Sequence, residues 1–390
     1  MLILKTAFKN ILGAGKRTWL NVAVLSFTFV VLVMFQGLMD GWFGNALRDT
    51  QAWETGAGQF WHPQYDRFDV FTLQDAHGGI SGEMQSYMDK GALTPILLTQ
   101  GVIYPQGRML NVLLKGIDPQ QRILSIPSEL LIADDEEMPV LIGSRMAKAA
   151  DLCAGDRVMM RWRDKNGAFD AREIRIAAIF DTQVSSVDQG QVWLNISDLQ
   201  QMISTPGEAT FLVKSVDCPL QTDTDGWVFK DLKFLLADLD AMWQAAKAET
   251  AIVYVLLLSI ALLAVFDTQM LSIFRRQKEI GTYVALGMTP RQVMGLFTLE
   301  GANYSLLAIG AGAVWGTPFL WFLAKYGYKI PGAVDDMGAA IGDRLYPSYE
   351  ISSIVTSILI IVLLSALISY LPTRKIAKQS IVSALKGKIE

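Results

Sequence analysis

Few residues in this chain are of types that do acid–base, metal or nucleophilic chemistry. Its only two histidines, His62 and His77, lie in a region rich in Asp and Gly. Two histidines without a regularly spaced third ligand indicate surface or packing roles more than a metal site. The sequence contains no HExxH run and no nucleophile elbow. We therefore expect a chain that is not itself an enzyme and that binds no metal.

The sequence also argues against a nucleotide or nucleic-acid site. Gly15-Lys16 resembles the end of a phosphate-binding loop, but Arg17 occupies the position that requires Ser or Thr. The first glycine of that loop is missing as well, and no strand precedes it. No pattern of interleaved basic and aromatic residues is present. We expect this chain to bind no cofactor of its own and no nucleic acid.

Four long apolar stretches determine where any functional residue can lie. A helix needs about 20 residues to cross the hydrocarbon core of a bilayer. The stretches at 19–39, 250–274, 297–324 and 351–372 meet that length. They predict an integral membrane protein, with lipid around its spans. The first stretch is too long for the core of a signal peptide, so we expect it to remain as a span.

Basic residues predict which side of the membrane each segment occupies. The N-terminal segment, the 275–296 segment and the C-terminal tail carry the basic residues Lys5, Lys9, Lys16, Arg17, Arg275, Arg276, Lys278, Arg291, Arg374, Lys375, Lys378, Lys386 and Lys388. Segment 40–249, in contrast, holds 18 basic and 30 acidic residues. By the positive-inside rule, both termini and the 275–296 segment lie in the cytoplasm, while 40–249 and a loop at 325–350 lie outside.

The fold class expected is a four-helix membrane part, arranged as one span and then three, with a large α/β domain outside the membrane between spans one and two. Segment 40–249 alternates short strand-like runs (112–117, 158–163, 172–180, 192–194 and 211–216) with helical ones (81–89, 144–150, 196–203 and 231–249). We place a strand-rich inserted subdomain at about 138–205. Segment 1–18 is an amphipathic helix on the inner membrane face or a charged anchor, and 373–390 is a cytoplasmic tail.

Segment 275–296 is the part that a cytoplasmic partner could grip. Basic residues leave the membrane, Gly287 allows a turn, and Thr289 starts a short new helix. Thr289 and Gln292 form a capping box, and Pro290 suits the first helical position. Val293, Met294 and Phe297 would form an apolar edge beside Arg291, suited to a groove on a partner. The alternative is a helix that only anchors at the membrane surface.

Three motifs resemble those of one known family. The run FRRQKEIGTYVALGMTPRQVMGLFTLEG resembles the segment between spans two and three of FtsX/MacB-type ABC permeases. The tail ISYLPTRKIAKQSIVSALKG resembles the closing segment of that family, and LIGSRMAKAADLCAGDRVMMRW resembles an element of its periplasmic domain. Cys153 and Ala154 depart from that element. Cys218 also lies in the predicted periplasmic segment, and whether the two cysteines form a disulfide stays open.

The resemblance implies a bacterial inner-membrane subunit that couples to a separate ATPase. Two copies, or two paralogues, would pair with an ATPase dimer that holds ATP and Mg. The residues implied in ATPase coupling are Arg275, Lys278, Glu279, Gly281, Gly287, Thr289, Pro290, Arg291, Val293 and Met294. Gly37-x-x-x-Gly41 and Gly312-x-x-x-Gly316 would allow close helix packing.

The run LNVLLKGIDPQQ resembles an element of lipoprotein-releasing permeases of the LolC/LolE kind. Such a function implies lipoprotein cargo, a cleft lined by Phe35, Met39, Tyr254 and Leu258, and a periplasmic carrier or adaptor. The alternatives are a MacB-like tripartite efflux permease and FtsX-like mechanotransmission. A membrane receptor that signals without an ATPase is more remote.

Overall fold

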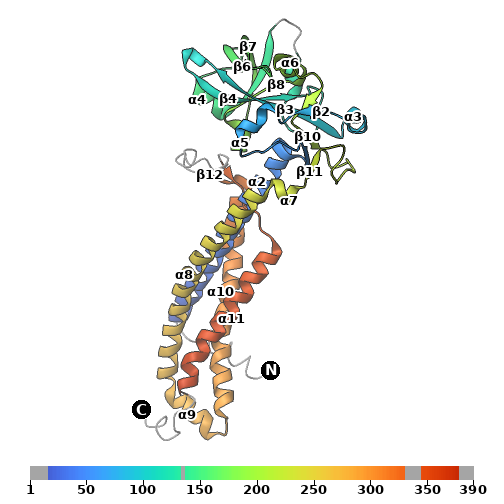
Figure 1. Cartoon of the computed structure of the whole chain (residues 1–390). Coiled ribbons are helices and arrows are strands. Elements are labelled where there is room, and N and C mark those ends of the chain that lie inside the picture. The colour runs from blue at the N-terminus through green and yellow to red at the C-terminus, as the bar shows by residue number, and fades with distance from the viewer. Residues whose placement is uncertain (1–15, 133–136, 330–343, 377–390) are drawn as a thin grey trace. The chain divides into compact units, whose positions relative to one another are not determined.

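The computed structural model describes residues 16–132, 137–329 and 344–376, and it divides into two units (Figure 1). A helical unit contains the described residues up to 43, 243–329 and 344–376, and a sheet unit contains those of 44–242. Most of the predicted segment 1–18 and of the tail 373–390 falls outside the described residues, as does most of the loop 325–350.

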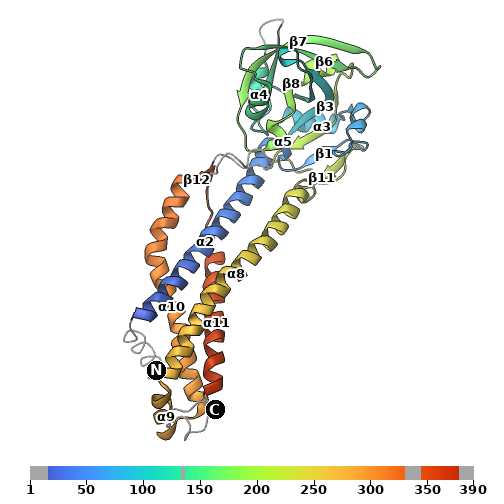
Figure 2. The same cartoon turned by 90° about the vertical axis from the view of Figure 1, so that its left-hand side faces the viewer.

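Four long helices make up the helical unit: α2 (Lys16–Thr50), α8 (Ala237–Arg275), α10 (Pro290–Tyr326) and α11 (Ile351–Ile376). Each is long and apolar enough to cross a membrane, which confirms the four predicted hydrophobic helices. The short helix α9 (Gln277–Ala285) joins α8 to α10, and the strands β12 (Tyr328–Lys329) and β13 (Arg344–Leu345) pair between α10 and α11. Figure 2 shows the long helices running lengthwise beside one another.

Glycines bring α10 close to α2, as the sequence predicted. A Cβ at Gly316 would lie 2.5 Å from Val30, and one at Gly312 would lie 2.9 Å from Phe29. The second glycine pair works differently. A Cβ at Gly41 would lie 2.1 Å from the carbonyl oxygen of Tyr346, which is outside any helix. The prediction of helix–helix packing was therefore wrong for Gly37 and Gly41, which contact residues 346–349 between β13 and α11 instead.

The sheet unit is built on nine strands in the order β11-β1-β10-β3-β4-β8-β5-β7-β6, with a further pairing between β3 and β6. That pairing closes six of the strands into a ring. The strands are β1 (Gln59–Trp61), β3 (Leu93–Ile103), β4 (Leu110–Ile117), β5 (Met138–Gly143), β6 (Arg157–Arg163), β7 (Phe169–Phe180), β8 (Gln191–Asn195), β10 (Phe211–Lys214) and β11 (Val228–Lys230). Strands β2 (Gly78–Gly79) and β9 (Glu208–Ala209) pair separately.

Short helices connect these strands. They are α3 (Gly82–Asp89), α4 (Ser144–Ala150), α5 (Ser185–Asp188), α6 (Ile196–Met202) and α7 (Leu232–Leu235), with π-helix η1 (Gln51–Thr55) and 3-10 helices η2 (Val70–Gln74), η3 (Pro105–Gly107) and η4 (Ser128–Leu131). Apolar side chains from both faces of the sheet form two large buried clusters. Because stretch 138–205 supplies β5 to β8, it shares one sheet with β3 and β4.

The fold differs from the sequence predictions in two places. Strand β3 was not among the expected strands, and it contains Pro95, a residue type that rarely lies in a central strand. Pro95 pairs only with β10, since pairing to β4 begins at Ile96, so its missing N–H costs no bond on the other side. The continuous helix expected over 231–249 is also wrong. It is broken at Leu236, where α7 ends and α8 begins one residue later.

Candidate functional site

A tight turn joins α9 to α10 at the end of the helical unit that the sequence predicts to be cytoplasmic. Helix α9 ends at Ala285, Gly287 takes a left-handed backbone with φ +97°, and α10 starts at Pro290. Such a φ suits glycine and strains other residues. The turn folds α9 back onto α10 through one buried apolar cluster, whose buried members are Ile273, Ile280, Val293 and Phe297.

The capping box predicted from the sequence is present at the start of α10. The Gln292 N–H donates to the Thr289 hydroxyl at 3.3 Å, and the Thr289 N–H donates to the Gln292 side-chain oxygen at 2.9 Å. These bonds satisfy two N–H groups that a helix start leaves without partners. The sequence predicted a short helix that ends after about two turns. Instead, α10 continues without a break into the third long apolar helix, to Tyr326.

A buried ion pair joins the α8–α9 junction to α10. Arg276 lies between the two helices, and its guanidinium donates to both Glu300 carboxylate oxygens, at 3.0 and 3.2 Å. The Glu300 side chain is only 2% exposed. Arg276 also donates to Glu279 at 2.8 Å and lies 5.1 Å from the centre of the Phe297 ring. Both bonds come from one guanidinium nitrogen, Nη1, and these charge-assisted bonds hold the α8–α9 junction against α10.

Polar groups of three helices meet next to Glu300. The amide of Gln269 on α8 is buried, and neither its nitrogen nor its oxygen has a hydrogen-bond partner among the described residues. The Ser369 hydroxyl on α11 is buried and equally unpartnered there. Between them lies Gly301, where a Cβ would be 1.8 Å from the Ser369 oxygen. Polar groups inside membrane helices are costly and commonly functional.

We call Gln269, Arg276, Glu300, Gly301 and Ser369 the junction cluster. Within it, the Arg276–Glu300 pair ties the α8–α9 junction to α10, and Gly301 brings α10 against α11. A displacement of α9 would therefore act on α10 and, through this close contact, on α11.

The predicted coupling residues divide into exposed and buried groups. Arg275, Glu279, Gly287, Thr289, Pro290 and Arg291 are exposed, Met294 is half-buried, and Gly281 is buried. Lys278 belongs to α9, but its side chain lies outside the described residues. The expectation that Val293 and Phe297 offer an exposed apolar edge is wrong, because both pack inward at 2% and 1% exposure. The exposed apolar side chain of the turn is Leu286, at 79%.

The residues predicted to line a cargo cleft mostly pack between α2 and α8. The rings of Phe35 and Tyr254 meet edge to face at 6.4 Å, and the Tyr254 hydroxyl donates to the Leu32 carbonyl at 3.4 Å. Leu258 is buried in the same contact, while Met39 is half-buried. A cleft at this place therefore requires α2 and α8 to separate.

The histidines and cysteines lie in the sheet unit. His77 Nδ1 pairs with the Glu208 carboxylate, and burial lowers the pKa of His62, with His77 adding to the effect. No group of three potential metal ligands occurs within the described residues. Cys153 is exposed and Cys218 is buried in a separate apolar cluster, and both are free.

Comparison with known proteins bears directly on the junction cluster. Residues 251–381 match the family described as FtsX-like permease C-terminal. This chain carries an FtsX-like permease domain. The domain takes in α9, the turn and all members of the junction cluster, so the geometry above belongs to a part of the chain that the family shares.

Two relatives extend the similarity beyond that domain. Both are the lipoprotein-releasing system transmembrane protein LolC of Xylella fastidiosa, from strains Temecula1 and 9a5c. They are 20% identical to this chain over 234 and 239 residues. Each match covers 55% of this chain and 57% of the relative, so the chain spans little more than half the length of either relative.

Sequence reasoning missed the pairing of Arg276 with Glu300. The two residues are 24 positions apart, so no local pattern connects them. The available signal was the charge itself. Glu300 is an acidic residue at the start of an apolar stretch, and an ionisable group inside a membrane span usually pairs with another polar or charged group. The nearest basic residues along the chain are those of the 275–291 segment.

Proposed function

We propose that this chain is the membrane subunit of an ABC transporter that couples ATP hydrolysis in a separate ATPase to movement of its sheet unit. The observation that carries the proposal is the FtsX-like permease domain at 251–381. The exposed turn within that domain, with Leu286 at its end, supports it independently. Exposed apolar groups beside charged ones are typical of protein interfaces.

In this proposal the ATPase dimer receives the turn, and closure of the dimer moves α9. The Arg276–Glu300 pair transmits that movement to α10 and α11. A second copy or a paralogue completes the membrane part. The chain resides in the bacterial inner membrane with both termini in the cytoplasm, and its sheet unit works in the periplasm, where a carrier or adaptor meets it.

The cargo we propose is lipoproteins, released from the inner membrane for transfer to the outer membrane. Two LolC proteins among the relatives and the LNVLLKGIDPQQ run support this choice. The second candidate is mechanotransmission without a lipid cargo, as in FtsX-like or MacB-like systems. The packing of Phe35, Tyr254 and Leu258 between α2 and α8 favours it, because a cargo cleft there has to be opened first.

Labelling tests the orientation. A cysteine introduced at Gln221, in a Cys153→Ser background, should react with an impermeant thiol reagent only from the periplasmic side. A cysteine at Gln277 should react only from the cytoplasmic side. Labelling of both positions from one side would refute the proposed topology and, with it, the coupling site.

Photo-crosslinking tests the cargo. A crosslinker at Met39 should capture a lipoprotein without ATP and lose it when ATP is added. Replacing the lipidated cysteine of the cargo with serine should abolish the adduct, since each buried methylene of the acyl chains contributes about 0.8 kcal/mol. A crosslinker at Leu363, which is 67% exposed on α11, provides the control position. Equal capture of unlipidated cargo would favour the mechanotransmission function.

A further inference from the structure

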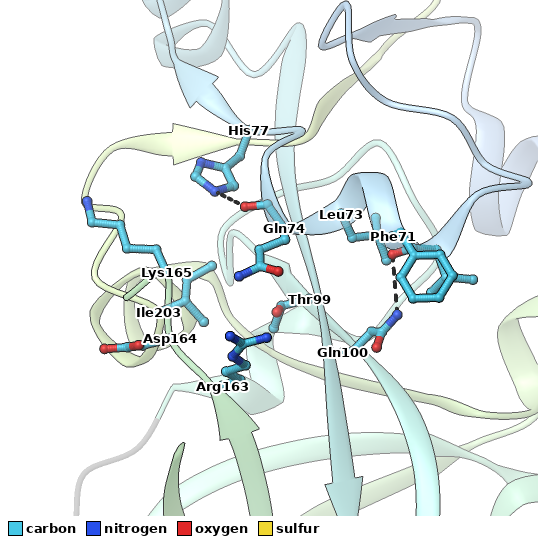
Figure 3. Close-up of a pocket in the computed structure, with 11 residues that line it drawn as sticks. Phe71, Leu73, Gln74, His77, Thr99, Gln100, Arg163, Asp164, Lys165 and Ile203 are labelled. Carbon is cyan, nitrogen blue, oxygen red and sulfur yellow. Dashed lines mark hydrogen bonds between the residues drawn. The ribbon is translucent and has the colours of Figure 1, made fainter. Parts of the chain in front are cut away.

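The sheet unit holds a cavity of about 210 Å³ that none of the functions above uses. Its walls come from η2 and the segment after it, from the middle of β3, from the end of α6, and from the turn that joins β6 to β7 (Figure 3). These elements are far apart in sequence, so the fold itself brings the lining residues together.

Two cations line the cavity without an internal counter-ion. Arg163 ends β6 and Lys165 lies in the turn, and neither forms an ion pair within the part of the chain that the structure describes. Asp164 lies between them, but its carboxylate accepts the N–H groups of Asn166 and Ala168, at 2.9 and 2.7 Å. Figure 3 shows that carboxylate directed away from the Arg163 guanidinium. Asp164 therefore shapes the turn and does not neutralise the cavity.

The other acidic group near the cavity is also engaged. Glu208 pairs with His77 Nδ1, and the second ring nitrogen of His77 lies 3.0 Å from the Gln74 carbonyl oxygen. The Arg163 Nε donates to the Gly167 carbonyl at 3.3 Å. This bond holds the guanidinium so that it points toward Thr99 and Gln74 (Figure 3). The remaining N–H groups of the guanidinium form a fork suited to a carboxylate or a phosphate.

One wall of the cavity is apolar. Phe71 is 89% exposed, which is unusual for an aromatic ring of a folded domain. Its backbone is held in place, because its N–H donates to Asp69 at 3.0 Å and Gln100 donates to the neighbouring Val70 carbonyl at 3.3 Å. Phe71 lies on the opposite side of the cavity from Lys165 (Figure 3). A ring is therefore presented across from the charges.

We propose that this cavity binds a small organic anion, a carboxylate or phosphate monoester that carries one apolar group of about the size of an aromatic ring. The acid group would meet Arg163 and Lys165, and the apolar group would cover Phe71. The volume favours a small ligand, since it is below the roughly 300–1,000 Å³ of pockets for drug-sized ligands. The inference is independent of the transport function proposed above.

Calorimetric titration of the purified full chain in detergent with phenyl phosphate tests the proposal. Phenyl phosphate should bind with one-to-one stoichiometry and more weakly at higher salt. Inorganic phosphate and phenol should each bind at least about tenfold more weakly, because inorganic phosphate lacks the apolar group and phenol lacks the anionic group. Equal affinity for phenyl phosphate and phenol would overturn the assignment of an anion site.

Variants locate the binding. Arg163→Gln should weaken phenyl phosphate binding at least about tenfold. Arg163→Lys keeps the charge but loses the fork, so its affinity should lie between those of the unchanged chain and Arg163→Gln. Phe71→Ser should weaken phenyl phosphate and leave inorganic phosphate unchanged. Arg161→Gln is the matched control, because Arg161 lies on the same strand but stacks on Phe169 outside the cavity. An equal loss in Arg161→Gln and Arg163→Gln would overturn the site.

A last comparison separates two sources of the same chemistry. Dihexanoyl phosphatidic acid carries the same phosphate monoester on a lipid. It should compete poorly with phenyl phosphate, because its acyl chains exceed the cavity. Benzyl phosphate serves as the small-molecule competitor. If the lipid displaces phenyl phosphate at a lower concentration than benzyl phosphate does, the small-molecule assignment is overturned in favour of a lipid headgroup.

Discussion

Two clusters of charge, one in each unit, use the same residue types in opposite ways. In the helical unit, Glu300 accepts from Arg276 with side-chain exposures of 2% and 19%. In the sheet unit, Glu137 pairs with Arg157 and Arg175, and all three side chains are at least one-third exposed. Water can replace the partners of Glu137 but not those of Glu300. The difference between the two clusters is therefore burial, not pairing.

This comparison indicates which ion pair can carry a mechanical signal. An exposed pair exchanges its partners with water and contributes little free energy. A buried pair cannot be opened without leaving a charge unpaired, so the elements that hold it move together. The Arg276–Glu300 pair joins the α8–α9 junction to α10. A movement of α9 would therefore be passed to α10.

The largest effect is expected for Glu300→Gln. It removes the buried carboxylate of the pair and leaves Arg276 with only the exposed Glu279 carboxylate, which should lower the free energy of unfolding by about 3 kcal/mol. Chemical unfolding in detergent measures this. The double variant Arg276→Met with Glu300→Leu should recover much of the loss, since it removes both charges. A double variant as unstable as Glu300→Gln would show that the pair acts through something other than burial.

Close packing beside the pair gives the next effect. Gly301→Ala places a methyl group against Ser369, which should cost about 1–3 kcal/mol. Ser369→Gly should rescue the Gly301→Ala variant by removing the Cβ that the methyl meets. Gly295→Ala on the same helix is the matched control, since nothing lies within 4 Å of its added Cβ. Equal destabilisation by both substitutions would refute the close contact of α10 with α11.

A buried charge in the sheet unit predicts a pH dependence. Lys115 is 5% exposed and lies over the Trp193 ring at 5.0 Å. Burial lowers the pKa of its ammonium group, while Glu54 acts in the opposite direction. Between the lowered pKa of the folded state and the ordinary lysine pKa of about 10.4, the unfolded chain binds more protons than the folded chain, so the free energy of unfolding should rise with pH across that window.

Replacement of that lysine tests the sign. Lys115→Met should raise the thermal midpoint at pH 7 and remove this rise above neutral pH, because no proton is then taken up on unfolding. Thermal unfolding between pH 7 and pH 10 measures both effects. A lower midpoint of the variant at pH 7 would contradict the account, because it would mean that the buried charge stabilises the unit.

The smallest effect is expected in the exposed cluster. Arg157→Gln should change the free energy of unfolding by at most about 1 kcal/mol, and less at high salt. Comparison with Glu300→Gln in one detergent, at low and high salt, places the two clusters on one scale. Effects of equal size would remove the distinction on which the coupling role of Arg276 is based.

Local features of this molecule could be predicted from sequence, and non-local ones could not. The four hydrophobic helices follow from the length of apolar stretches, and the Thr289 cap follows from residues three positions apart. The inward packing of Val293 could not be predicted, since an apolar edge does not show which surface covers it. The pairing of Arg276 with Glu300 could not be predicted either, and neither could β3. Pro95 is tolerated in β3 only because the pairing of β3 to β4 begins one residue later, at Ile96.

The central claim is that the α9–α10 turn couples this chain to an ATPase, and Leu286→Glu tests it most directly. The measurement is ATPase turnover in proteoliposomes that contain the chain and its proposed partner ATPase. The account predicts that Leu286→Glu inserts normally but loses ATPase association and stimulation, since a charge would enter the interface. Val216→Glu, at an 87% exposed valine of the sheet unit, should leave both unchanged. Unaltered association and turnover in Leu286→Glu would contradict the claim.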